Sequence, residues 1–139
     1  MSVDYGIYIN GKFPTELLSG IHFVKESGVE PDFRGNAFDG CLFVYFTDKG
    51  LSSIFTEEEL GFVPTAKIIL SPNMDAYEKS MTAIVDVINM LIRTSCMLSL
   101  YQSNEILLLQ KNSSGVFLYN EFSWWDEYFD LLDFNFTNA

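Results

Sequence analysis

The sequence predicts an α+β fold: a mostly antiparallel sheet, one long helix packed on it, and shorter helices including a C-terminal one. Three observations support this prediction. Short runs rich in β-branched and aromatic residues alternate with turn residues. One long stretch repeats apolar residues at three- and four-residue spacing. An aromatic, acidic segment closes the sequence. At 139 residues the chain suits a single domain, residues 1–139.

Several strands are expected in the first half of the chain, at residues 4–9, 21–25, 41–46 and 66–70. Asn10-Gly11 is a hairpin turn signal. Residues 26–40 contain three glycines and one proline, which predicts a long loop. The run CLFVYF is apolar at nearly every position and predicts a central strand covered on both faces. Pro72 and Asn73 are expected to end the last of these strands.

A long helix is predicted from about Asp75 to Arg93, with Asn73 or Asp75 as its cap. Its apolar residues form one stripe, which we expect to pack on the sheet: Met81, Ile84, Val85, Ile88, Leu91 and Ile92. Thr56 and Glu59 form a capping box that opens a short helix.

Three strands in close succession are predicted next, at residues 96–101, 105–110 and 116–119, as an antiparallel meander. A last helix is predicted from Ser123, with Ser123 and Asp126 as an S-x-x-D cap.

The segment EFSWWDEYFDLLDF, residues 121–134, has five carboxylates and no lysine or arginine. A helix would place Trp125, Phe129 and Leu132 on one face, and would place Asp126, Asp130 and Asp133 opposite them. Like charges at this spacing repel, at about 0.2–0.5 kcal/mol per pair. The acidic face is therefore either solvated surface or a site for a cationic partner. Because Trp124 and Trp125 are adjacent, one of them should be more exposed than the other.

The net charge is −11, from 19 acidic and 8 basic residues. Such a charge argues against binding nucleic acid and against docking on anionic membranes. It favours a basic partner, or serves solubility alone. The amino-terminal residues MSVDYGIYI resemble no signal peptide, and no stretch is apolar enough to cross a membrane, so we expect a cytoplasmic protein.

Catalytic motifs are missing from the sequence. His22 is the only histidine, and it is more simply a strand residue than part of a catalytic triad. Cys41 and Cys96 lie in apolar runs and are expected to be buried thiols, although the sequence alone leaves a disulfide open. The acidic run from Glu57 to Glu59 has no calcium-loop spacing. We therefore expect a protein that is not an enzyme and needs no cofactor or metal.

The second half of the chain, from the helix AYEKSMTAIVDVINMLI to NEILLLQKNSSGVFLYNEFSWWDEYFDLL, resembles small immunity proteins of bacterial contact-dependent growth inhibition and related polymorphic toxin systems. The shared layout is a long helix, a hairpin with an acidic start, and an aromatic-led C-terminal helix. The hairpin loop, Asn112–Gly115, is longer than usual, and the double Trp is an addition.

The resemblance implies a protein that binds the toxin domain delivered by a neighbouring cell, often a nuclease with a basic cleft. On charge and amphipathicity, the predicted contact residues are Glu121, Trp124, Asp126, Glu127, Tyr128, Asp130 and Asp133. The loop with Asp32 and Asp39 is a second candidate surface. An alternative is an acidic adaptor for a basic endogenous protein, which could act as a homo-oligomer. A carboxylate-based metal enzyme is the third reading.

Overall fold

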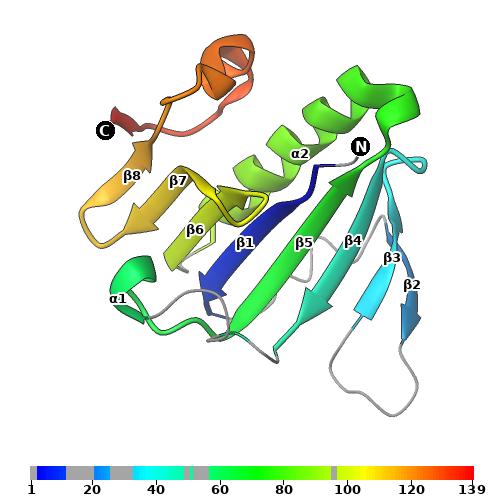
Figure 1. Ribbon diagram of the computed structural model, residues 1–139, viewed down its shortest axis with the longest axis horizontal. Helices are drawn as coiled ribbons and strands as arrows, with labels where there is room; N and C mark the ends of the chain where they lie inside the picture. The colour runs from blue at the N-terminus through cyan, green and yellow to red at the C-terminus, as the bar shows by residue number, and fades with distance from the viewer. Residues whose placement is uncertain (1–2, 12–20, 26–32, 49–50, 52–56, 95–96) are drawn as a thin grey trace.

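The computed structural model describes residues 3–11, 21–25, 33–48, 51, 57–94 and 97–139. These residues form one nine-stranded sheet in the order β2-β3-β4-β5-β1-β6-β7-β8-β9. Every neighbouring pair is antiparallel except β8 and β9, which are parallel. Figure 1 shows helix α2 lying along one side of this sheet. The fold is therefore α+β with a mostly antiparallel sheet, as the sequence predicts.

The sheet buries the side chains of alternate positions against α2 (Tyr77–Ile92). In β1 (Tyr5–Asn10) the core residues are Tyr5, Ile7 and Ile9, and in β5 (Ala66–Pro72) they include Ile68 and Leu70. The whole apolar stripe predicted for the helix is buried. Alternation in the strands and helical spacing in α2 thus build one core between the two layers.

Most predicted elements are confirmed. The remaining strands and helices have these bounds: β2 Ile21–Lys25, β4 Leu42–Thr47, α1 Glu57–Leu60, the 3₁₀ turn η2 Met74–Ala76, β6 Met97–Gln102, β7 Ile106–Asn112 and β8 Gly115–Leu118. Asn73 caps η2 rather than α2, since its side-chain oxygen accepts from the backbone N–H of Asp75 at 3.0 Å. The predicted box at Thr56 lies outside the described residues.

Three expectations for the first half are wrong. The loop predicted over 26–40 contains a strand, β3 (Phe33–Ala37), because this segment pairs with both β2 and β4. Asn10-Gly11 does not join β1 to a neighbouring strand as a hairpin, since β1 pairs with β5 and β6. Strand β4 is not covered on both faces, because Phe43 is 40% exposed on the side away from α2. Periodicity does not report which strands become neighbours, and pairing decided the first two cases.

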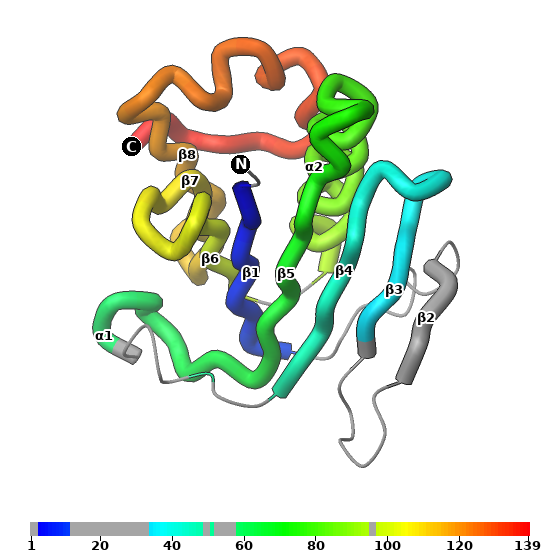
Figure 2. The backbone as a smooth tube through the Cα atoms, turned by 45° about the vertical axis from the view of Figure 1, so that its right-hand side comes forward, coloured from blue at the N-terminus to red at the C-terminus, as the bar shows by residue number. Residues whose placement is uncertain are grey.

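The predicted C-terminal α-helix is replaced by two short 3₁₀ turns, η3 (Trp124–Glu127) and η4 (Phe129–Leu131), and a two-residue strand, β9 (Thr137–Asn138). The reason is the number of apolar residues. Seven of them pack against the core: Trp124, Trp125, Tyr128, Phe129, Leu132, Phe134 and Phe136. A single helix presents only one stripe, whereas a chain of turns and extended residues brings all seven inward. In Figure 2 this segment arches beside α2 and returns to the sheet.

Helix α2 is the longest helix in the described part of the chain. No helix there is both long and apolar enough to cross a membrane.

Candidate partner-binding surface

The two tryptophans hold the C-terminal segment to the sheet. Trp125 is fully buried, and its indole N–H donates to the carbonyl of Leu108 at 2.8 Å. Trp124 is half-buried, and its indole N–H donates to the hydroxyl of Tyr5 at 3.1 Å. Burial raises the pKa of Tyr5, against the opposing effect of this hydrogen bond. Trp124 is thus the more exposed of the pair, yet its polar atom points into the protein.

Tyr128, the other predicted aromatic anchor, is also half-buried. Its ring lies 4.8 Å from that of Trp124, centroid to centroid. Burial, followed by the electrostatic influence of Tyr77, raises the pKa of Tyr128. Both predicted anchors therefore pack on each other and on the core instead of projecting into solvent.

Asn120 fixes the start of the first turn with both ends of its side-chain amide. Its oxygen accepts from the backbone N–H of Trp125 at 2.8 Å, and its nitrogen donates to the carboxylate of Asp126 at 2.7 Å. Ser123, the predicted cap, has a left-handed backbone with φ of 57°, and its side chain makes no capping hydrogen bond. The cap expected at Ser123 is therefore wrong, and Asn120 performs that role.

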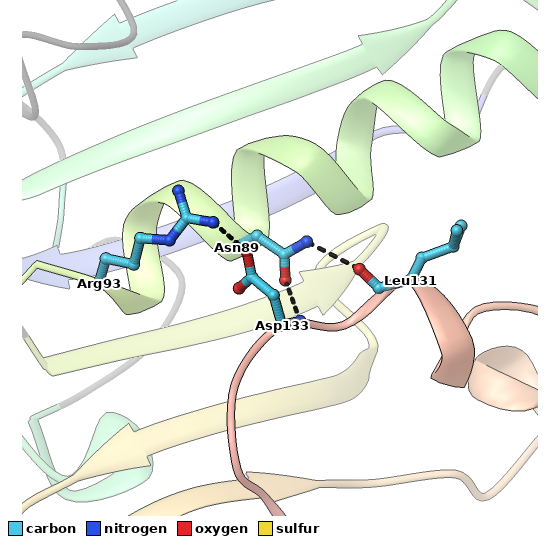
Figure 3. Close-up of polar contacts among 4 residues, drawn as sticks. All are labelled: Asn89, Arg93, Leu131 and Asp133. Carbon is cyan, nitrogen blue, oxygen red and sulfur yellow. Dashed lines mark hydrogen bonds and ion pairs between the residues drawn. The ribbon is translucent and has the colours of Figure 1, made fainter.

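The end of the segment is clamped to α2 (Figure 3). The side chain of Asn89 is nearly buried. Its nitrogen donates to the carbonyl of Leu131 at 2.9 Å, and its oxygen accepts from the backbone N–H of Asp133 at 3.1 Å. The side chain of Asp133 also forms an ion pair with Arg93. One of the five carboxylates therefore has a counter-charge, which comes from another element of the fold.

The predicted acidic face does not exist as a single helical face. Asp126 lies in the first turn, Asp130 in the second, and Asp133 beyond both, where the chain is extended. The exposed members of the predicted contact set are Glu121, Asp126, Glu127, Asp130 and Asp133. Within the described part of the chain, Glu121, Glu127 and Asp130 make no ion pair. The segment is therefore a rigidly held, largely uncompensated acidic surface.

A groove of about 740 Å³ opens beside Glu121, between the start of β7 and the C-terminal end of β8. Phe122 lines it and is 66% exposed, more than any other large hydrophobic residue among those described. Glu105 faces the same groove. Neither Phe122 nor Glu105 is among the predicted contact residues. The sequence signal of Phe122 is an aromatic beside an acid, outside the apolar stripe of the expected helix, and that of Glu105 is its place at the acidic start of the hairpin.

The second candidate surface is represented by Asp39, since Asp32 lies outside the described residues. Asp39 is exposed in the β3–β4 turn and lines a groove with Glu78 and Asp86 of α2. Burial, and then repulsion from Asp133, raises the pKa of Asp86. The free, half-buried thiol of Cys41 lies in the same groove. The expected burial of Cys41 is thus partial, and Cys96 is outside the described residues.

The described residues contain no group of three or more His, Cys, Asp or Glu side chains placed to hold a metal. His22 lies in strand β2, as expected. What the described surface offers is carboxylates, a groove and an exposed aromatic ring. Carboxylates and an exposed aromatic ring can both contact cationic groups.

No protein-family model, curated protein or solved structure matches this chain.

Proposed function

We propose that this protein is an antidote that binds a toxin domain in the cytoplasm and neutralises it without catalysis. The observation that carries the proposal is the C-terminal surface. Glu121, Glu127 and Asp130 are exposed there without ion pairs to described residues. The chain as a whole has a net charge of −11, so the acidic surface lies in a field of the same sign. A basic protein is the complementary partner.

The hydrogen bonds that hold the C-terminal segment in place make this surface suitable for tight binding. Asn89, Asn120 and Trp125 hold the segment through hydrogen bonds to backbone atoms, so its carboxylates are ordered before a partner arrives. Ordering in advance lowers the entropy lost on association. Opposite charge raises the association rate, which suits an inhibitor that must reach its target before damage accumulates. A toxic nuclease with a phosphate-binding cleft fits this surface, because carboxylates can occupy the positions of phosphates.

Growth rescue tests the proposal. The C-terminal domain of the protein encoded immediately upstream of this gene would be expressed in a host cell, with and without the present protein. We expect growth arrest that only co-expression relieves, and a stable complex of the two proteins in gel filtration. Toxicity that co-expression fails to relieve would contradict the proposal and favour an acidic adaptor of a basic endogenous protein.

A further inference from the structure

The groove beside Glu121 is formed by three segments that meet at one end of the sheet. The residues that line it are Glu105, Ile106, Leu107, Tyr119, Asn120, Glu121, Phe122 and Ala139. They come together because β7 and β8 are paired, with the backbone N–H of Tyr119 donating to the carbonyl of Leu108 at 3.0 Å. Ala139 reaches the same place by donating its N–H to the carbonyl of Leu118 at 2.9 Å. Backbone pairing therefore sets the shape of the groove.

The lining combines apolar and anionic groups. Ile106 and Leu107 are half-buried at the start of β7, whereas Glu105 and Glu121 are exposed. None of the eight lining residues is Lys, Arg or His. Neither glutamate forms an ion pair with any residue that the structure describes. An occupant with an apolar stem and a positive end would satisfy both kinds of group.

The exposed ring of Phe122 distinguishes between arginine and lysine as the cationic side chain that would occupy the groove. Its ring is largely in solvent, although Trp124, Trp125 and Tyr128 beside it all pack inward. An exposed aromatic face next to carboxylates is a stacking platform for a planar cation. The guanidinium of arginine is planar and presents paired N–H donors to carboxylates, whereas the ammonium of lysine is a compact, strongly hydrated point charge.

We infer that this groove binds an arginine side chain of the basic partner, with the guanidinium over Phe122 and its N–H groups toward Glu105 and Glu121. A second copy of this chain is a poor occupant, because it would bring the same carboxylates to the interface. The inference rests on the proposed function for the identity of the partner, but its chemistry can be measured without that partner.

The test uses the full chain and three hexapeptides in which glycine alternates with arginine, lysine or citrulline. Citrulline keeps the planar shape of arginine without its charge. Two-dimensional ¹H–¹⁵N NMR would follow each titration. We expect the arginine peptide to shift amides of residues 105–107 and 119–122, and the citrulline peptide to shift none. The lysine peptide should bind about threefold more weakly than the arginine peptide, because it cannot stack.

Substitutions in the groove test which side chains bind the peptides. Phe122→Ala should weaken the arginine peptide about threefold, to the affinity of the lysine peptide, with little change for the lysine peptide itself. Glu105→Gln with Glu121→Gln should weaken both peptides. Phe43→Ala is the matched control, since Phe43 is also an exposed phenylalanine but lies in β4, and it should change nothing. All these side chains are exposed, so circular dichroism should show an unchanged fold.

Two results would overturn the inference. One is amide shifts centred on the other groove, around Asp39 and Glu78, with none at Phe122. The other is equal binding of the arginine peptide by wild type and Phe122→Ala. Neither depends on growth rescue. A chain that binds arginine in this groove but rescues no cell would contradict only the proposed function, and a chain that rescues but ignores the peptide would contradict only this inference.

Discussion

The side-chain oxygen of Asn89 accepts a hydrogen bond from the backbone N–H of Asp133 at 3.1 Å, across 44 positions of the sequence. The same amide donates to the carbonyl of Leu131 at 2.9 Å. One side chain on α2 thus takes the place of the hydrogen bonds that a helix would have given this part of the chain. It also sets the position of Asp133 relative to Arg93 and Asp86.

Replacing Asn89 with alanine should destabilise the protein by about 1–3 kcal/mol, because a carbonyl and an N–H lose their partner in a partly buried site. Urea unfolding followed by circular dichroism measures this free energy. Asn36→Ala is a suitable control, because Asn36 is exposed on β3. Its change should stay within about 0.5 kcal/mol. Equal effects of the two substitutions would show that the hydrogen bonds of Asn89 contribute nothing to stability.

Neutralising Asp133 should lower the pKa of Asp86. Burial is the larger cause of the raised pKa and repulsion from Asp133 is the second, so Asp133→Asn should move the pKa of Asp86 toward its ordinary value without reaching it. Carboxyl ¹³C NMR across a pH titration would report this value in both proteins. An unchanged pKa of Asp86 would mean that the two carboxylates do not interact.

Asp86→Asn should make the protein more stable at pH 7. A carboxyl whose pKa is raised by folding binds protons better in the folded state, so the wild type loses stability as pH rises through that folded pKa. The asparagine variant does not titrate and avoids this loss. The two proteins should become equal below the ordinary pKa of about 3.9. Unfolding midpoints in urea, measured from acid to neutral pH, test this, and a difference that grows toward acid would contradict it.

The two tryptophans should differ in their protection from solvent and in their contribution to the free energy of unfolding. Trp124→Phe leaves Trp125 as the only tryptophan, whose emission should be poorly quenched by acrylamide because the side chain is fully buried. It should cost about 1 kcal/mol, for the lost hydrogen bond to Tyr5. Trp125→Ala should cost about 3–5 kcal/mol, the range for deleting a large core side chain. Strong quenching of Trp125 would contradict the packing of the C-terminal segment.

Removing the unpaired carboxylates should slow association with the toxin domain. The variant Glu121→Gln, Glu127→Gln, Asp130→Asn should lower the association rate by about tenfold at low salt, and by less as salt is added. Stopped-flow fluorescence measures this rate. Asp133 is left intact because Arg93 pairs with it.

A control with the same change in net charge separates local from general effects. The control variant is Asp48→Asn, Glu58→Gln, Asp75→Asn, whose three acids are exposed and lie outside both the C-terminal segment and the groove at Asp39. Their joint replacement should slow association less. If both variants behaved alike, net charge alone would explain the rate and the C-terminal surface would not be the contact.

Local patterns in the sequence determined much of the fold. Strands β1 and β5, the apolar stripe of α2 and the meander of β6, β7 and β8 were all predicted, because each depends on the residue pattern within one segment. Charge and composition likewise determined that the C-terminal segment would be exposed on its acidic side.

Tertiary contacts decided the rest. Residues 33–37 became a strand because β2 and β4 lie on either side of them, a pairing that their own sequence does not encode. The C-terminal segment does not form the predicted α-helix, because seven of its apolar side chains pack against one core. Asn89 and Asn120 also supply hydrogen bonds from outside the turns. The exposure of Phe122 and the pairing of Asp133 with Arg93 follow from that path. Both depend on contacts between segments far apart in sequence, and local spacing gives no information about such contacts.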